Sequence, residues 1–483
     1  MVDNKQIVKG LVWKLMERIG VQGVSFVLQL ILARLLAPEH YGVLSLMIIF
    51  TSLSNVFIQQ GFNTALIQNK DVTDEDFSSV FWVTLGIAAV LYGGLYVSAP
   101  AIASFYNTPE IILPFRVLSL MLFPGALNSV QLAIIRRRMN FKKVFTSNVG
   151  AIVCAGIAGI VLAYMGAGLW ALVAQNLINV CVSCIVMWFT VRWRPKLVLN
   201  FKRIRVLFGY GWKLLFSSLL DTLYQDLRSL IIGKKYDSGT LGYYNRGKQF
   251  PQLFMQSINS TVQSVMLPAM AAEQDDRTRV KQMMRFSINM SAYIIFPMMA
   301  GLAVVAEPLV TLLLTEKWLP CVPYMQVYCI TMAFYPVHTC NLQAINAIGR
   351  SDLYLKLEIV KKAYGVITLV VAVLCFDSPF AIAMTGLITT WISWFVNALP
   401  NKKLLGYSMK EQMGDLLPSI IISGVMAGCV LFIGIFRLHV LLKLLLQVVT
   451  GIFVYILTSA IVKPKPYKML ISKASGILKK KQI

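Results

Sequence analysis

Charged residues are scarce in this sequence. They make up 14% of its 483 residues, whereas hydrophobic residues make up 57%. A soluble domain is about half apolar and about a quarter charged. This imbalance excludes a set of soluble domains and predicts one all-α domain, a polytopic membrane protein whose surface faces lipid.

Acidic residues and histidines are also few. Asp and Glu number 21 against 45 Lys and Arg, and the three histidines, His40, His338 and His439, lie far apart. Most cysteines lie within apolar runs, where a thiol behaves as a small hydrophobic group. Cys181 and Cys184 form a lone CxxC pair without a second pair or a nearby histidine, which favours helix packing over a metal or redox site. We therefore expect no metal and no cofactor.

Long apolar segments divide the chain into predicted transmembrane helices. A helix needs about 20 mostly apolar residues to cross the hydrocarbon core, and fourteen segments are long enough. The first carries Lys14, Glu17 and Arg18 and lacks a small-residue cleavage site, so we expect a retained helix and no cleavable signal peptide. The segments are 10–35, 41–66, 78–99, 111–135, 144–163, 168–191, 206–232, 241–269, 286–306, 321–348, 353–375, 379–400, 415–436 and 440–462.

The basic residues predict the orientation of these segments. With the N-terminus inside, the basic clusters at 136–143, 192–205, 277–285 and 463–481 are cytoplasmic. The predicted outer loops hold only Lys234, Lys235, Lys317 and Arg437. Cytoplasmic loops of membrane proteins are enriched in Lys and Arg, so we expect both termini in the cytoplasm. The net charge of +24 then sets topology and contacts anionic membrane lipids, and nucleic acid is not an expected partner.

Two predicted loops bear on enzymatic alternatives. Asp74, Glu75 and Asp76 form an acidic run, which we interpret as a solvated cytoplasmic loop and not as the metal-binding motif of a glycosyltransferase. The longest predicted outer loop, 307–320, is short for a membrane enzyme that acts on sugars at the outer face. Both loops argue against an enzyme.

The sequence repeats itself at a spacing near 200 residues. The run GLVWKL at 10–15 recurs as GYGWKL at 209–214, and Gly42 corresponds to Gly242. Further along, Pro124 corresponds to Pro336 at an offset of 212. A repeat that contains an even number of helices gives two copies of the same orientation.

The repeat predicts the domain organisation. We expect two parallel six-helix repeats, an N-lobe at 1–200 and a C-lobe at 201–400. Two extra C-terminal helices and a basic cytoplasmic tail follow at 401–483. Such a duplicated bundle suits alternating access, in which two halves rock about a central site.

Four predicted helices carry polar residues on one face. In helix 10–35 these residues recur every three or four positions, and the stripe of helix 206–232 lies at equivalent positions of the repeat. Helices 41–66 and 241–269 form a second equivalent pair. Interhelical hydrogen bonding is one explanation. A water-filled central cavity between the four helices is the other, and it fits two equivalent pairs better.

The stripes supply the candidate site. Cations outnumber anions among the charged members, which suits an anionic headgroup, and the planar fork of Arg makes paired hydrogen bonds with phosphate. Glu17, Asp221 and Asp226 are candidates for ion coupling, or for ion pairs with neighbouring cations. The candidate substrate-binding residues are Lys14, Arg18, Gln22, Arg34, Gln59, Asn63, Lys213, Arg228, Arg246, Gln252, Asn259 and Gln263.

Four stretches of the chain carry a family resemblance: LARLLAPEHYG at 32–42, GFNTALIQ at 61–68, LGYYNRG at 241–247 and TEKWLPCVPYMQ at 315–326. In combination they resemble the Wzx-type polysaccharide transporters of the multidrug/oligosaccharidyl-lipid/polysaccharide (MOP) flippase superfamily. The likeness covers most of the chain and is weakest in the last two helices. It implies a MATE-like fold with two six-helix lobes.

The resemblance also implies a function. The substrate would be an undecaprenyl-diphosphate-linked oligosaccharide repeat unit, turned from the inner to the outer leaflet of the bacterial cytoplasmic membrane for O-antigen, capsule or exopolysaccharide synthesis. H⁺ or Na⁺ would be the coupling ion, and polysaccharide-assembly proteins would be possible partners. A cation-coupled multidrug exporter and a peptidoglycan-precursor flippase on the same fold are the alternatives. A polymerase or ligase fits less well, because the chain is duplicated and its outer loops are short.

Overall fold

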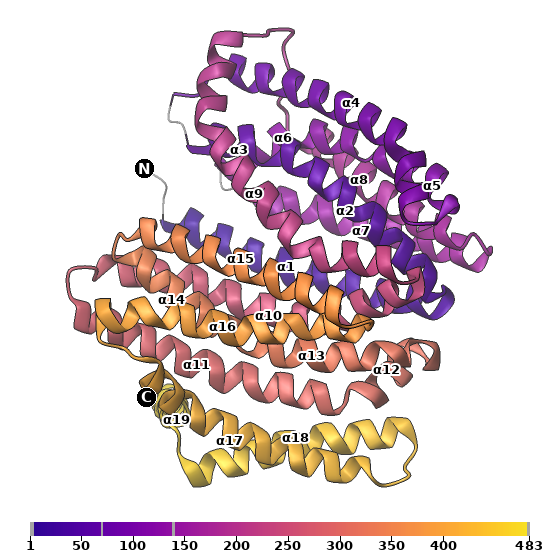
Figure 1. Ribbon diagram of the computed structural model, residues 1–483. Helices are drawn as coiled ribbons and strands as arrows, with labels where there is room; N and C mark the ends of the chain where they lie inside the picture. The colour runs from indigo at the N-terminus through magenta and orange to yellow at the C-terminus, as the bar shows by residue number, and fades with distance from the viewer. Residues whose placement is uncertain (1–3, 69–70, 138–140, 481–483) are drawn as a thin grey trace. The chain divides into compact units, whose positions relative to one another are not determined.

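The computed structural model is built from helices (Figure 1). It describes residues 4–68, 71–137 and 141–480, and their side chains except at 4–19, 64, 68, 141, 210 and 473–480. These ranges contain no β-strand. By its internal contacts the chain divides into two compact units, Met1–Gly242 and Tyr243–Ile483. The predicted lobe boundaries at 200 and 400 follow the sequence repeat and stay predictions.

Among the described residues, the first unit contains nine α-helices, one 3-10 helix and the first turn of α10. They are α1 (Asn4–Leu35), α2 (Pro38–Gln59), α3 (Gly61–Gln68), α4 (Asp74–Phe105), the 3-10 helix η1 (Pro109–Ile111), α5 (Ile112–Ser119), α6 (Leu122–Arg137), α7 (Phe141–Tyr164), α8 (Leu169–Thr190) and α9 (Phe201–Lys235).

The second unit begins within α10 and ends with a short basic helix. Its elements are α10 (Ser238–Ala272), α11 (Arg277–Val304), α12 (Ala306–Leu314), the 3-10 helix η2 (Glu316–Cys321), α13 (Val322–Ala333), α14 (Tyr335–Ala347), α15 (Ser351–Cys375), α16 (Pro379–Leu405), α17 (Met409–Gly434), α18 (Val440–Val462) and α19 (Lys465–Lys480).

All fourteen predicted segments lie in helical parts of the chain, although segments 41–66, 111–135 and 321–348 each cover more than one helix. Among the described residues, nine helices are long and apolar enough to cross a membrane. The long helices α9 and α10 are not among these nine. They carry two of the predicted polar stripes, and their polar residues lower the mean hydropathy. The all-α membrane fold is confirmed, and the count of fourteen spans stays a prediction.

The two halves of the chain break the same helix of the repeat. A 3-10 turn, η1 or η2, precedes this helix, which then divides into α5 and α6 in one half and α13 and α14 in the other. Pro124 and Pro336, which correspond in the repeat, lie in the first turns of α6 and α14. Proline lacks a backbone N–H and is tolerated there. The predicted outer loop at 307–320 is therefore wrong as a loop, because α12 and η2 occupy most of it.

The first turns of α2 and α10 meet in a reciprocal contact. A Cβ atom on Gly42 would lie 1.7 Å from the carbonyl oxygen of Ser238, and one on Gly242 would lie 2.2 Å from that of Pro38. Pro38 and Ser238 occupy equivalent positions of the repeat, as the two glycines do. Only glycine permits so close an approach of two backbones. The corresponding helices of the two repeats therefore touch through equivalent residues.

Candidate functional site

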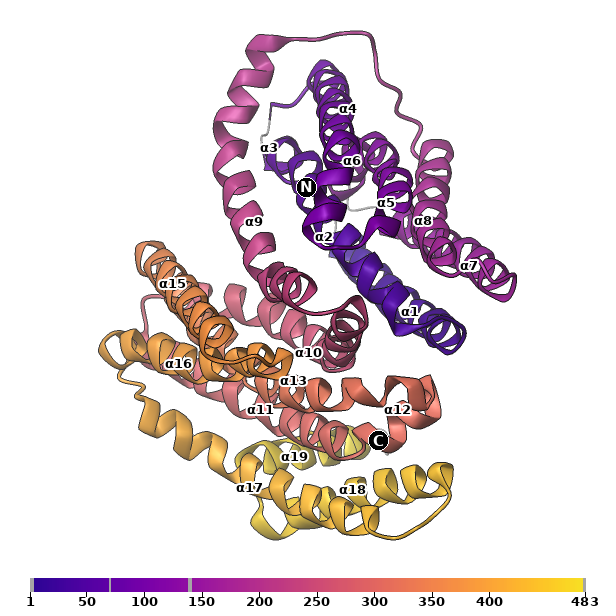
Figure 2. The same cartoon turned by 45° about the vertical axis from the view of Figure 1, so that its right-hand side comes forward.

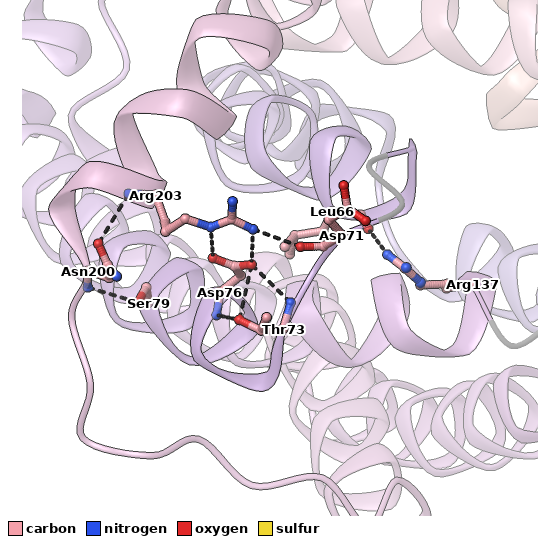
Figure 3. A network of polar contacts seen from close by, with 8 residues as sticks. All are labelled: Leu66, Asp71, Thr73, Asp76, Ser79, Arg137, Asn200 and Arg203. Atoms are coloured by element: carbon pink, nitrogen blue, oxygen red, sulfur yellow. Dashed lines mark hydrogen bonds and ion pairs between the residues drawn. The ribbon is translucent and has the colours of Figure 1, made fainter.

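A polar network joins the start of α4 to the start of α9 within the first unit (Figure 3). Thr73 and Asp76 form a capping box at the start of α4: the backbone N–H of Asp76 donates to Thr73 Oγ1 at 3.3 Å, and that of Thr73 donates to Asp76 Oδ2 at 2.9 Å. This arrangement satisfies two backbone donors that a helix start leaves unpaired. Residues 74–76 therefore begin a helix, and their predicted loop is wrong.

Arg203, at the start of α9, binds the same carboxylate. Its Nε donates to Asp76 Oδ1 at 2.8 Å and its Nη2 to Oδ2 at 2.7 Å, while Nη2 also donates to the carbonyl of Asp71 at 2.8 Å (Figure 3). The Asp76 side chain is 1% exposed and that of Arg203 is 36% exposed. The hydrogen bond and charge of Asp76 raise the pKa of the Arg203 guanidinium. The prediction that residues 74–76 are solvated is therefore wrong for Asp76, which is buried. Asp74 and Glu75 are exposed.

The linker between α8 and α9 is bound to α4 as well. Ser78 Oγ accepts from the backbone N–H of Lys196 at 3.0 Å, and the indole of Trp82 donates to the carbonyl of Lys196 at 2.9 Å. Ser79 Oγ accepts from Asn200 N–H at 3.0 Å (Figure 3). Contacts from Asp76, Ser78, Ser79 and Trp82 of α4 therefore hold the linker and the start of α9, the helix that bears one predicted polar stripe.

Two predicted site residues of the first unit bond to each other. Asn63 on α3 donates to Gln59 Oε1 at 3.3 Å, and Gln59 at the end of α2 donates to the carbonyl of Gly125 on α6 at 3.2 Å. Asn63 is 2% exposed. Hydrogen bonds of this kind are expected if the polar stripes serve to join helices and do not line a water-filled cavity. A role of either amide in substrate binding stays a prediction.

Arg246 on α10 is the most buried cation of the predicted site whose side chain is described. It is 5% exposed, its Nη1 donates to Gln249 Oε1 at 2.6 Å, and its guanidinium lies over the Trp318 ring of η2, 5.1 Å from the ring centre. Such a cation–π contact stabilises a charge away from water. The second unit therefore holds this guanidinium in a fixed place.

The remaining predicted residues differ in exposure. Arg34, Lys213 and Gln263 are exposed; Gln22, Asp221, Asp226, Arg228 and Gln252 are half-buried; Asn259 is buried. The side chains of Lys14, Glu17 and Arg18 lie outside the described residues. The stripes of α1, α2, α3 and α9 belong to the first unit, whereas that of α10 from residue 243 belongs to the second. Their convergence on one cavity stays a prediction.

Sequence reasoning missed a second charged network, between α11 and α17. Arg285 donates through Nη2 to Asp415 Oδ1 at 2.7 Å and pairs through Nε with the other oxygen of that carboxylate. Lys281 pairs with Glu411 at 3.1 Å, and Tyr407 donates to Asp415 Oδ2 at 2.8 Å. The bases lie four residues apart on one helix and the acids four apart on the other. This matched spacing is visible in the sequence and could have predicted two adjacent ion pairs.

An uncharged network lies next to it. Gln412 accepts from the Trp394 indole at 2.9 Å and donates to Asn341 Oδ1 at 3.0 Å, and Asn401 donates to the same oxygen at 2.9 Å. All four side chains are 0% exposed. They join α14, α16 and α17. Among the described residues, no three His, Cys, Asp or Glu side chains are grouped so that they could hold a metal ion.

Comparison with known proteins decides the family. The family described as "Polysaccharide biosynthesis protein" matches residues 31–323, more than half of the chain. The chain belongs to this polysaccharide biosynthesis family. The resemblance carried by the four quoted stretches is thereby confirmed.

Relatives in this family match along nearly the whole chain. Succinoglycan biosynthesis transport protein ExoT of Rhizobium meliloti is 23% identical, over 87% of each chain. Teichuronic acid biosynthesis protein TuaB of Bacillus subtilis is 25% identical, over 86% of each chain. Lipopolysaccharide biosynthesis protein WzxC of Escherichia coli is 21% identical, over 87% of each chain. The family is one of membrane transporters, and this chain is a multi-pass membrane transporter of polysaccharide biosynthesis.

Solved structures show the same fold. Lipid II flippase MurJ in an inward closed conformation matches with a TM-score of 0.74 and 16% identity, covering 96% of this chain and all of that one. An inward-facing multidrug resistance MATE family transporter of the MOP superfamily matches with a TM-score of 0.61 and 15% identity, covering 82% of this chain and 98% of that one. The MOP fold that the resemblance implies is confirmed.

Proposed function

We propose that this family member turns a lipid-linked oligosaccharide repeat unit, carried on undecaprenyl diphosphate, from the inner to the outer leaflet of the bacterial cytoplasmic membrane. Alternating access of the two repeats would move the headgroup through a central cavity, with both termini in the cytoplasm. The observation that carries the proposal is the alignment of transport and biosynthesis relatives over 87% of both chains.

The names of those relatives narrow the chemistry that is recognised. Those names refer to three different polysaccharides, succinoglycan, teichuronic acid and lipopolysaccharide, and this variety favours recognition of a group that their precursors share over recognition of one sugar sequence. A diphosphate attached to a lipid is a chemical group that such substrates can have in common. The basic residues of the predicted polar stripes suit that group, because Arg and Lys make charge-assisted hydrogen bonds with phosphate oxygens.

Specific roles follow for the predicted site. Arg18 and Arg228 lie on stripes at corresponding helices of the repeat, and we assign them to the diphosphate in the inward-open and outward-open states respectively. Asp221 and Asp226 are assigned to H⁺ or Na⁺ coupling. Only a small part of Arg246 could contact the headgroup, because its guanidinium is covered by the Trp318 ring and the residue is only 5% exposed.

A reconstituted flipping assay tests the proposal. The full-length protein is placed in liposomes that contain a fluorescent undecaprenyl-diphosphate oligosaccharide, and the fraction of headgroup reached by an external glycosidase is followed over time. We expect loss of protection with the protein and none with empty liposomes. Flipping of a lipid-linked peptidoglycan precursor alone, or transport of a cationic dye alone, would overturn the proposal in favour of one of the alternatives.

A further inference from the structure

A cavity of about 500 Å³ lies in the second unit between α11, α17 and the start of α19. Figures 1 and 2 both draw α19 beside α17. Arg285, Asn289, Ser419, Lys463 and Lys465 supply polar groups to its wall. A volume of this size lies in the range of small-molecule sites. The predicted topology puts this end of the three helices at the cytoplasmic surface.

The charges on the wall leave a positive excess. Arg285 uses its Nε and Nη2 edge for Asp415, so its Nη1 remains directed away from that pair. Glu411 is paired with Lys281. Lys463 and Lys465 are exposed, and neither forms an ion pair within the described part of the chain. The two lysines therefore present ammonium groups that suit an anion.

An apolar groove continues from the same place. A second cavity of about 210 Å³ shares Arg285, Asn289, Lys465 and Pro466 with the first, and Phe286, Met290, Met469 and one polar residue, Gln282, line the rest of it. The Phe286 side chain is 41% exposed. A polar compartment joined to an apolar one matches a molecule with a charged head and a hydrocarbon chain.

The helix that forms one wall is itself amphipathic. Apolar residues recur every three or four positions along α19, and lysines follow the opposite side. Within its described part, Leu470 is 45% exposed and Ile471 is 49% exposed, with Lys468 exposed close by. A basic helix with an uncovered apolar side is typical of a segment that lies in the plane of the membrane interface.

We propose that this cavity binds an anionic phospholipid of the cytoplasmic leaflet. Its phosphate contacts Lys463, Lys465 and the Nη1 of Arg285, and one acyl chain lies along Phe286, Met290 and Met469. α19 lies in the interface and closes the cavity from the side. The site shares no residue with the polar stripes and does not depend on the proposed substrate.

Native mass spectrometry of the purified full-length protein tests this assignment. The protein is mixed with equal amounts of phosphatidylglycerol and phosphatidylcholine of distinguishable mass. We expect the protein to retain phosphatidylglycerol preferentially, and the double variant Lys463→Ala, Lys465→Ala to retain about tenfold less, because each lysine near an anionic headgroup contributes to its binding. The double variant Lys402→Ala, Lys403→Ala at the end of α16 removes the same charge away from the cavity and should bind as the unmodified protein does.

Several outcomes would overturn the proposal. They are equal retention of the two lipids, equal losses in the two double variants, and displacement of the lipid by millimolar inorganic phosphate, which would indicate a simple anion site. Capture of a partner protein by α19 without lipid preference would point to a protein interface instead. Melting temperatures of both variants verify that they fold. Because no substrate is present, failure here leaves the proposed flipping untouched.

Discussion

Gly42 lies so close to Ser238 that a Cβ atom there would be 1.7 Å from the Ser238 carbonyl oxygen. The atom in its way belongs to the backbone, which cannot rotate aside as a side chain can. The equivalent contact between Gly242 and Pro38 repeats the arrangement. Two glycines 200 residues apart in the repeat therefore allow the first turns of α2 and α10 to pack closely within the first unit.

The first prediction concerns these glycines. Gly42→Ala and Gly242→Ala should each lower the melting temperature and reduce transport, because α2 and α10 must separate to admit a methyl group. Ala normally stabilises a helix by up to about 1 kcal/mol relative to Gly. Gly86→Ala on α4, where nothing lies within 4 Å of the added atom, is the matched control and should be neutral or stabilising. Equal effects at Gly42 and Gly86 would show that the close approach is unimportant.

The second prediction concerns the pair of Asp76 and Arg203. Asp76→Asn should lower the free energy of unfolding by about 1–3 kcal/mol, between the values for exposed and buried pairs, since Asp76 is buried and Arg203 is partly exposed. Denaturant titration in detergent measures the change. Asp74→Asn, in the same first turn but exposed, should change stability by less than about 0.5 kcal/mol. A loss at Asp74 as large as that at Asp76 would contradict the assignment.

The third prediction concerns the pair of Arg285 and Asp415. Alanine at either position should destabilise the second unit, and the double variant should lose less than the sum of the two, because the interaction can be lost only once. We expect a coupling energy of about 1–3 kcal/mol. Additive losses would mean that the two side chains act independently.

The fourth prediction concerns the proposed diphosphate contacts. Arg18→Ala and Arg228→Ala should each reduce flipping about tenfold or more, since a hydrogen bond to a charged group contributes about 1.5–3 kcal/mol. Lys at either position should restore transport in part, because an ammonium cannot make the paired bonds of a guanidinium. Arg437→Ala, in the exposed turn between α17 and α18, is the control for charge alone. Normal flipping by a well-folded double variant would show that the stripes are structural.

The fifth prediction concerns coupling. Asp221→Asn should remove the dependence of transport on pH or on sodium, because an amide neither gains a proton nor holds a cation as a carboxylate does. Transport is compared across imposed H⁺ and Na⁺ gradients, with protein level and melting temperature recorded. An unchanged gradient dependence would exclude Asp221 as the coupling group.

The sequence alone was sufficient for the membrane fold and the family. Scarce charge and long apolar runs predict helices in lipid, because an unpaired backbone polar group is too costly there. All fourteen predicted segments are helical, and the equivalent prolines mark the broken helix of each half. These features depend on local composition and period, which a linear sequence records directly.

Only the tertiary structure shows which polar residues form hydrogen bonds and ion pairs with one another. Asp76 reads as one of three exposed acids, yet it is buried because Arg203, 127 residues away, reaches it. Gln59 and Asn63 read as cavity residues, yet they bond to each other and to α6. Such pairings depend on which helix faces which across the unit, and neither hydropathy nor period encodes that. The ion pairs between α11 and α17 are the exception. Their bases and their acids are each spaced four residues apart, so this pairing could have been predicted from the sequence.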